Sequence, residues 1–344
     1  MTSGPTPAIL AATLFGISTP LAKMILGKMP PLWLASLLYL GSGVGLHLVL
    51  IFKKESLFAS LKSLNFRSRS QLLGAIVAGG IIAPTCLVYG LSLASSFETS
   101  LLLNFETVAT TLIAWLIFKE NIGRHVLLGK LFIVAGSILV ATQGAGHFSL
   151  PAFLILGACF FWGVDNNLTR DLEELSPSAL GCIKGWGAGC FNLVLALLWE
   201  PQFLTPGQVA FSMLIGAISY GGSIVLFVQS LRLIGASRTG TFFSTNPFIG
   251  MILSILILRE HPSPMLWIAG ALSLIGILIL AREVHSHSHS HEPITHHHLH
   301  FHDEHHLHDH DYEVGSEAHD HVHTHQHLVH THSHYPDIHH RHHD

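Results

Sequence analysis

The sequence predicts an all-α membrane protein: ten transmembrane helices as two inverted five-helix repeats, followed by a disordered histidine-rich tail. Three observations support this prediction. Charged residues make up 11% of the chain, less than half of the roughly 25% that is usual in soluble domains. The mean hydropathy is +0.49 although a polar tail is included. Runs of about 20 apolar residues recur, and a helix of that length spans the hydrocarbon core of a bilayer.

Ten such runs can be marked, and the short segments between them contain glycine, proline or charged residues. The first run follows MTSGPTP, which has no basic residue. We therefore interpret that run as a helix and not as a cleaved signal peptide. The expected spans are 6–26, 32–52, 71–93, 97–118, 125–142, 150–169, 178–199, 208–230, 237–258 and 264–282.

Lysine and arginine are distributed unevenly between the two sides of these spans. With the N-terminus in the cytoplasm, only Lys23, Lys28 and Arg259 fall on the opposite side. An excess of basic residues is typical of cytoplasmic loops, so we expect a multi-pass protein of the bacterial inner membrane with both termini in the cytoplasm. The residues on the cytoplasmic side are Lys53, Lys54, Lys62, Arg67, Arg69, Lys119, Arg124, Arg170, Arg232, Arg238 and Arg282.

The chain partly repeats itself. At an offset of 140 residues, IFKE (117–120) aligns with ILRE (257–260), and at an offset of 147, FGISTPLAK (15–23) aligns with WGVDNNLTR (162–170). Each half then has five spans, and an odd number inserts the halves in opposite senses, as in many secondary transporters. This pattern favours transport over a receptor or a membrane-bound enzyme, so we expect no enzymatic activity. The expected domains are 1–142, 143–283 and the tail, 284–344.

With a Phe/Trp-Gly pair in the first and sixth spans and a basic-Glu pair after the fourth and ninth, the chain resembles EamA-type members of the drug/metabolite transporter superfamily. The resemblance covers about residues 6–283. It implies a carrier of a small solute such as an amino acid, nucleoside, sugar or amphipathic drug. No ATP-binding motif GxxxxGK[ST] occurs, so ion coupling or facilitated movement is expected and no cofactor is required. The tail is not a general feature of the family.

Glu106 is expected near the middle of the fourth span, where an ionisable group costs roughly 2.5–3.5 kcal/mol on insertion scales. Asn246 takes the equivalent place in the ninth span, so the two side chains are expected to face one transport cavity. Asn104, Thr107 and Thr110 add polar groups around the carboxyl. The alternative is structural: a protonated Glu106 hydrogen-bonded to a neighbouring helix.

Asp165, Asn166 and Asn167 form the most polar point of the sixth span, and at least one of them should point into the bundle. By helical rise, Asp165 lies roughly 7–8 Å from the cytoplasmic end of its helix and Lys184 about 9 Å into the next. The matching depths predict a buried Asp165–Lys184 ion pair, which is either structural or a gate or proton-linked switch.

Tyr89 and Gln229 are equivalent in the repeat, and they either line the cavity or pack in the core with satisfied polar tips. Glu98 has a different role, because SSFE (95–98) has the pattern of a capping box that opens the fourth span.

The chain has 29 histidines, and 25 of them lie in its last 60 residues, in the tail. Neutral imidazole binds zinc, nickel, cobalt and copper. The tail contains too few apolar residues to form a core, so we expect it to be disordered without metal. Such a string suits buffering, capture or sensing of metal. The expected ligands are His285, His287, His289, His291, His296, His297, His298, His300, His302, His305, His306, His308, His310, His321, His323, His325 and His327.

The leading hypothesis is therefore an exporter of a small metabolite or drug-like solute across the inner membrane. One alternative is a nickel, cobalt or zinc transporter whose tail captures or senses the ion. Another is a membrane-anchored metal store or sensor without transport. The expected partners are a small solute, the lipid bilayer and a divalent transition metal at the tail, with no nucleic acid, and the protein is expected to be a monomer or homodimer.

Overall fold

The structure is a computed structural model. It describes residues 5–119, 123–142, 147–169, 172, 174–234, 239, 242–281, 285–291, 295–300, 319–324 and 328–334. These residues belong to two separate units, a helical unit within residues 1–282 and a tail unit within residues 283–341.

The first half of the helical unit contains long helices and short pieces between them. In chain order they are α1(Thr6–Leu26), α2(Pro31–Phe52), α3(Leu57–Ser63), α4(Phe66–Ala75), η1(Ile76–Ile82), α5(Ala83–Leu93), α6(Ser96–Leu102), α7(Phe105–Phe118) and α8(Arg124–Thr142).

The second half follows a similar order in the part that the structure describes. Its helices are α9(Leu150–Thr169), α10(Pro177–Trp199), α11(Pro206–Ile215), η2(Gly216–Gly222), α12(Ser223–Ile234), α14(Asn246–Leu258) and α15(Pro264–Ala281).

The prediction of an all-α membrane fold is confirmed for the helical unit. Within the described residues, nine helices are long and apolar enough to cross a membrane, with consecutive pieces such as α4, η1 and α5 counted as one span. The helix α14 is apolar but has 13 residues, and the expected ninth span, 237–258, includes residues outside the described part. Many large apolar side chains on these helices are exposed, which is the surface that a bilayer covers.

Two helix ends occur at the same place in both halves. Lys119 ends α7 and Arg259 ends α14, each in the left-handed backbone region with φ of 55° and 54°. That region is uncommon for residues other than glycine, and it stops a helix. The capping box predicted for Ser95 and Glu98 is present at the start of α6.

Two π-helical segments also recur. The segments η1 and η2 have seven residues each and interrupt α4–α5 and α11–α12, with their first residues, Ile76 and Gly216, 140 positions apart. A π turn shifts the hydrogen-bond ladder and often marks a functional position. In η1, the Gly79 carbonyl accepts hydrogen bonds from Tyr39 Oη at 2.6 Å and Trp162 Nε1 at 3.0 Å.

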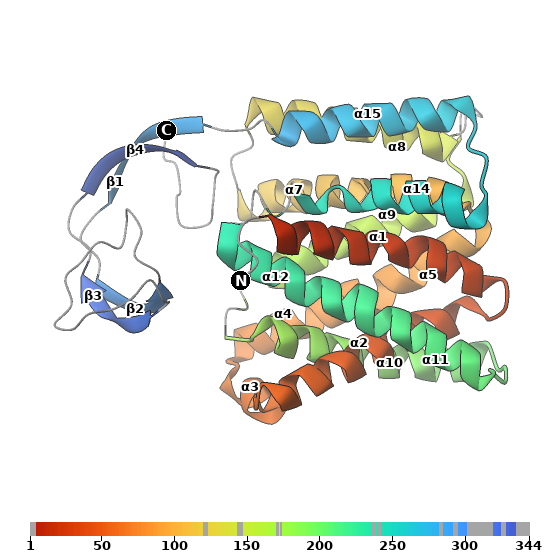
Figure 1. Ribbon diagram of the computed structural model, residues 1–344, viewed down its shortest axis with the longest axis horizontal. Helices are drawn as coiled ribbons and strands as arrows, with labels where there is room; N and C mark the ends of the chain where they lie inside the picture. Colours follow the sequence, from red (N-terminus) through yellow and green to blue (C-terminus); the bar gives the residue numbers. More distant parts are fainter. Residues whose placement is uncertain are drawn as a thin grey trace. The chain divides into compact units, whose positions relative to one another are not determined.

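The helices pack in pairs that join the two halves. As Figure 1 illustrates, they run side by side, and α2 packs on α10, α8 on α15, α1 on α14 and α7 on α9. Buried residues from α5, α6, α9 and α15 form the largest apolar cluster. The sixth span, α9, therefore lies between elements of the first half, where its polar residues meet other helices.

The tail unit contains two antiparallel two-stranded sheets. One pairs β1(His285–His291) with β4(Leu328–His334), and the other pairs β2(Thr295–His300) with β3(His319–Thr324). The sequence predicted no regular structure here, so these strands are a correction. The physical reason is that histidines separated by Ser, Thr or Val are compatible with extended backbone. A sheet of only two strands is marginally stable in water.

Candidate functional site

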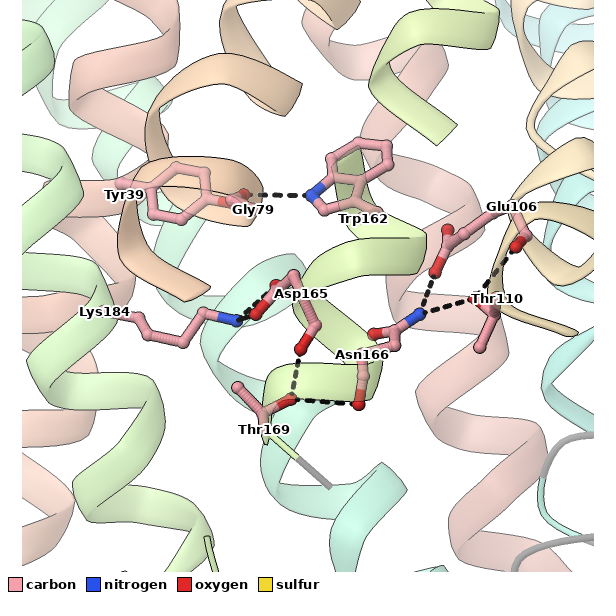
Figure 2. A network of polar contacts seen from close by, with 9 residues as sticks. All are labelled: Tyr39, Gly79, Glu106, Thr110, Trp162, Asp165, Asn166, Thr169 and Lys184. Carbon is pink, nitrogen blue, oxygen red and sulfur yellow. Dashed lines mark hydrogen bonds and ion pairs between the residues drawn. The ribbon is translucent and has the colours of Figure 1, made fainter. Parts of the chain in front are cut away.

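Glu106 and Asn166 form the first part of the candidate site. The Asn166 Nδ2 donates to Glu106 Oε1 at 3.0 Å and to Thr110 Oγ1 at 3.2 Å, and Thr110 Oγ1 donates to the Glu106 carbonyl at 2.9 Å (Figure 2). Asn166 is exposed and Glu106 is partly exposed, although both lie inside membrane spans. Polar groups at this depth are costly unless they border water or a solute, so they indicate a polar surface inside the bundle.

Asp165 and Lys184 form the second part. The Lys184 Nζ lies 2.7 Å from Asp165 Oδ1 and also contacts Oδ2. The side chains are only 13% and 6% exposed for Lys184 and Asp165. The predicted ion pair is confirmed as a contact. Thr169 Oγ1 also donates to the Asp165 carbonyl, which holds the last turn of α9.

The helix α9 directs its three polar residues differently. In Figure 2, Asp165 points toward Lys184 on α10 and Asn166 points toward Glu106 on α7. Asn167 is buried, and its Nδ2 donates to the carbonyls of Thr110 and Gly163, so its role is to tie α9 to α7. Consecutive helix residues are about 100° apart, which allows one helix to contact both neighbours.

The aromatic cluster of Phe15, Tyr39, Trp162, Tyr220 and Phe243 lies next to this site. Ring centroids are 6.3 Å apart for Phe15–Trp162, 5.6 Å for Phe15–Tyr220 and 5.7 Å for Phe15–Phe243 and Tyr39–Tyr220. Trp162 is one helical turn from Asn166 on α9. The sequence analysis used the alignment of Phe15 with Trp162 for the repeat and for the family resemblance, and it missed the contact between these rings.

Two glycines follow these aromatic residues and bring helices close together. A Cβ on Gly16 would lie 2.5 Å from the Asn246 carbonyl oxygen, and one on Gly163 would lie 2.9 Å from the Thr110 amide nitrogen. A larger residue would therefore separate α1 from α14 and α9 from α7. Close approach through small residues is typical of membrane helix interfaces.

Glu106 and Asn246, which were expected to face one cavity, have different hydrogen-bond partners. The carboxylate meets Asn166, whereas Asn246 donates from Nδ2 to the Phe243 carbonyl at 2.8 Å. Asn104 makes the same bond three residues back, to Leu101, at 3.1 Å, and its buried Oδ1 has no partner. Asn104 is the residue before α7, and Asn246 is the first residue of α14. Because each donates to the carbonyl three residues back, Asn246 resembles Asn104 in structure more than it resembles Glu106.

Tyr89 and Gln229 do not join this site. The Tyr89 hydroxyl donates to Glu200 Oε1, and the Leu32 amide donates to Oε2 of the same carboxylate at 2.9 Å. Tyr89 is therefore part of a contact between α5, α10 and the start of α2, which is the structural alternative. Gln229 is exposed on α12.

Two charged residues stabilise helix ends, although the sequence analysis used Lys23 only to assign topology and Glu260 only as part of the repeat and the family resemblance. Lys23 Nζ donates to the Ala94 carbonyl at 2.6 Å, after the end of α5. Glu260 accepts from the amides of Ser96 and Phe97, both at 2.8 Å, at the start of α6. A cation at a helix C-terminus and an anion at an N-terminus are both favourable to the helix dipole. The sequence signal that could have revealed this role is the Arg259–Glu260 pair, because Glu260 caps the start of α6.

Among the residues that the structure describes, no group of three or more histidine, cysteine, aspartate or glutamate side chains could hold a metal ion. The metal ligands predicted in the tail lie either outside the described residues or on strands for which only the backbone is described. The metal prediction therefore stays a prediction.

Comparison with known proteins adds a family. The model of the EamA-like transporter family matches residues 2–142 and again residues 149–282. A solved crystal structure covers 80% of this chain and 96% of its own, with a TM-score of 0.61 and 16% identity. At 16% sequence identity, this similarity is evidence for the fold alone.

Three relatives carry transporter names. An uncharacterized transporter of Methanothermobacter thermautotrophicus is 28% identical over 79% of this chain and 84% of its own length. The uncharacterized transporter YyaM of Bacillus subtilis is 24% identical over 76% of this chain and 88% of its own. A protein of Streptantibioticus cattleyicolor named "Probable terminal-alkyne amino-acid exporter" is 25% identical over 54% of this chain and 63% of its own.

Proposed function

The chain belongs to the EamA-like transporter family, and on that premise we propose that it exports a small metabolite or drug-like solute as a secondary transporter. The observation that carries this proposal is the Glu106–Asn166–Thr110 group inside the bundle, next to the aromatic cluster. A carboxylate, an amide and a hydroxyl offer hydrogen bonds to a polar solute. The neighbouring rings offer an apolar surface for the rest of it.

The proposal includes two inverted repeats, residues 1–142 and 143–283. Three observations support it: the family model matches twice, η1 and η2 have the same length and spacing, and both Lys119 and Arg259 end helices in the left-handed region. Repeats of opposite orientation rock about a site at their interface. The contact between Phe15 of α1 and Trp162 of α9 belongs to that interface.

Glu106 is the proposed coupling residue. Among the described residues, its carboxylate accepts from the Asn166 amide and has no cationic partner, unlike Asp165, which Lys184 neutralises. A single carboxyl in this setting can bind a proton or a cationic group of the solute in alternation. The Asp165–Lys184 pair then holds α9 against α10 while α9 also contacts α7.

The proposed setting is the bacterial inner membrane, with both termini in the cytoplasm. The support is the excess of lysine and arginine at one side of the spans, including Lys53, Lys54, Lys62, Arg67 and Arg69. Export then moves the solute from this basic side to the side of Lys23 and Glu260.

The experiment measures uptake by inside-out membrane vesicles. The probes are radiolabelled amino acids, including the terminal-alkyne amino acid propargylglycine, and organic cations, with a pH gradient imposed. Glu106→Gln keeps the size of the side chain and removes its titratable proton, so we expect pH-driven transport to be lost. Glu174→Gln is the matched control, because Glu174 contacts Ser68 and Asn65 at the end of the bundle. Equal activity of both variants at every pH would contradict the coupling role of Glu106.

A second candidate function is transport of nickel, cobalt or zinc, favoured by the 25 histidines in the last 60 residues. In the leading proposal the tail buffers or senses metal, whereas in this alternative it hands metal to the path. A metal store without transport would need no polar group such as Glu106 within the spans. Flux of ⁶³Ni into proteoliposomes containing the full chain would favour metal as cargo.

A further inference from the structure

A groove lies at the basic end of the helical unit, and its lining contains none of the candidate-site residues Glu106, Asp165, Asn166 and Lys184. Its volume is about 470 Å³, which lies within the range of roughly 300 to 1,000 Å³ that is typical of small-molecule sites. We propose that this groove binds an anionic phospholipid, with an acyl chain against its apolar wall and the headgroup phosphate at Lys62 and Arg69. The lining residues are Phe58, Leu61, Lys62, Leu64, Arg69, Leu72, Leu73, Ile76 and Ile183.

One wall of the groove comes from α4 and the start of η1. Arg69, Leu72, Leu73 and Ile76 are spaced i, i+3, i+4 and i+7, so they share one helix face. Arg69 stands at the end of this face nearest the loop, and Ile76 lies about 10 Å further along the span. The face thus changes from cationic to apolar with increasing depth in the membrane. A phospholipid has a matching order, with its anionic headgroup at the surface and its acyl chains deeper.

The opposite wall comes from α3, a short helix that the sequence analysis did not predict. Ser56 caps it by accepting from the Ala59 amide at 3.3 Å, and Leu64 just after it belongs to a buried cluster that includes Ile183. The helix is therefore held in place, yet Phe58 remains 78% exposed. An exposed aromatic ring beside a basic residue is typical of the membrane–water interface.

The two cations at the groove are available to a phosphate. Among the described residues, neither Lys62 nor Arg69 has an acidic partner, since Glu174 is engaged by Ser68 and Asn65. Arginine forms paired hydrogen bonds with phosphate oxygens, and lysine adds a second positive charge. An anionic headgroup satisfies both residues, while a neutral lipid would leave their charge uncompensated.

The test uses the full chain purified in detergent and titrated with dioleoylphosphatidylglycerol or dioleoylphosphatidylcholine, followed by native mass spectrometry. Each basic residue near an anionic lipid changes affinity about fivefold. We therefore expect the variant K62Q/R69Q to bind phosphatidylglycerol about thirtyfold more weakly and to lose its preference over phosphatidylcholine. The matched control K54Q/R67Q removes the same charge from the same end of the bundle but outside the groove, and it should keep the preference.

A third variant tests the apolar wall. Leu73 is 63% exposed, so Leu73→Trp is tolerated on the surface but fills the groove, and it should weaken both lipids. The proposal is overturned if K62Q/R69Q and K54Q/R67Q weaken binding equally, because the attraction would then be a diffuse surface charge. It is also overturned if Leu73→Trp has no effect, or if glycerol 3-phosphate competes as well as the lipid, because the acyl chain would then have no part.

Discussion

Replacement of Lys184 by methionine removes one partner of the Asp165–Lys184 ion pair. The pair is buried, with exposures of 13% and 6% for Lys184 and Asp165, so the remaining carboxylate cannot regain full hydration. Removal of one partner of a buried pair typically costs about 3–5 kcal/mol. We expect Lys184→Met to lower the free energy of unfolding by about 3 kcal/mol, at the lower end of that range, because the carboxyl can take up a proton.

The double variant D165N/K184M tests the origin of that loss. It removes both charges and leaves side chains of similar size, and replacing a whole buried pair is often close to neutral. We expect it to lose less than about 2 kcal/mol, so that the coupling between the two substitutions is large and favourable. The loss in Lys184→Met alone should shrink at low pH, where the remaining Asp165 carboxyl is protonated and carries no charge.

Unfolding in mixed micelles of sodium dodecyl sulfate and a mild detergent measures these free energies at two pH values. Lys54→Met is the control, because Lys54 is exposed beyond the end of α2 and exposed charges contribute little. The reasoning is refuted if Lys184→Met is no more harmful than Lys54→Met, or if the losses of the single substitutions D165N and K184M simply add in the double variant.

The remaining predictions concern packing, topology and the tail. Gly163→Ala places a methyl group 2.9 Å from the Thr110 amide nitrogen and should cost about 1–3 kcal/mol by overpacking, whereas Gly157→Ala, with open space around it, should be neutral in the same unfolding assay. Reporter fusions at residue 60 and after residue 283 should both report cytoplasm, and a periplasmic signal from either contradicts the proposed topology. Truncation after Glu283 should leave membrane insertion unchanged and abolish tight nickel or zinc binding in isothermal titration, while stoichiometric binding by the truncated protein would place the metal site in the helices.

Some side-chain contacts could be predicted because they depend on position along a helix. Each residue of an α-helix adds a fixed rise of about 1.5 Å, so the depths of Asp165 and Lys184 followed from counting, and their contact is present. The capping box of Ser95 and Glu98 depends on four consecutive residues, and it was predicted for the same reason.

Other contacts could not be predicted because they depend on the rotation of helices about their own axes. Glu106 meets Asn166 and not Asn246 because Gly163 lets α9 approach α7 at Thr110. Tyr89 was placed by its alignment with Gln229, but its hydroxyl meets Glu200, which is more than 100 residues away in the chain.

The sequence alone determined the membrane class, the positions of most spans, the family resemblance and the histidine-rich composition of the tail, because hydropathy, spacing and composition are properties of consecutive residues. Only the tertiary structure decided the partners of Glu106 and Tyr89, the π segments, the aromatic cluster and the groove beside α3. The physical reason is that lipid solvates one apolar helix face as well as another. The rotation of each helix is therefore chosen by close packing and by hydrogen bonds between distant parts of the chain.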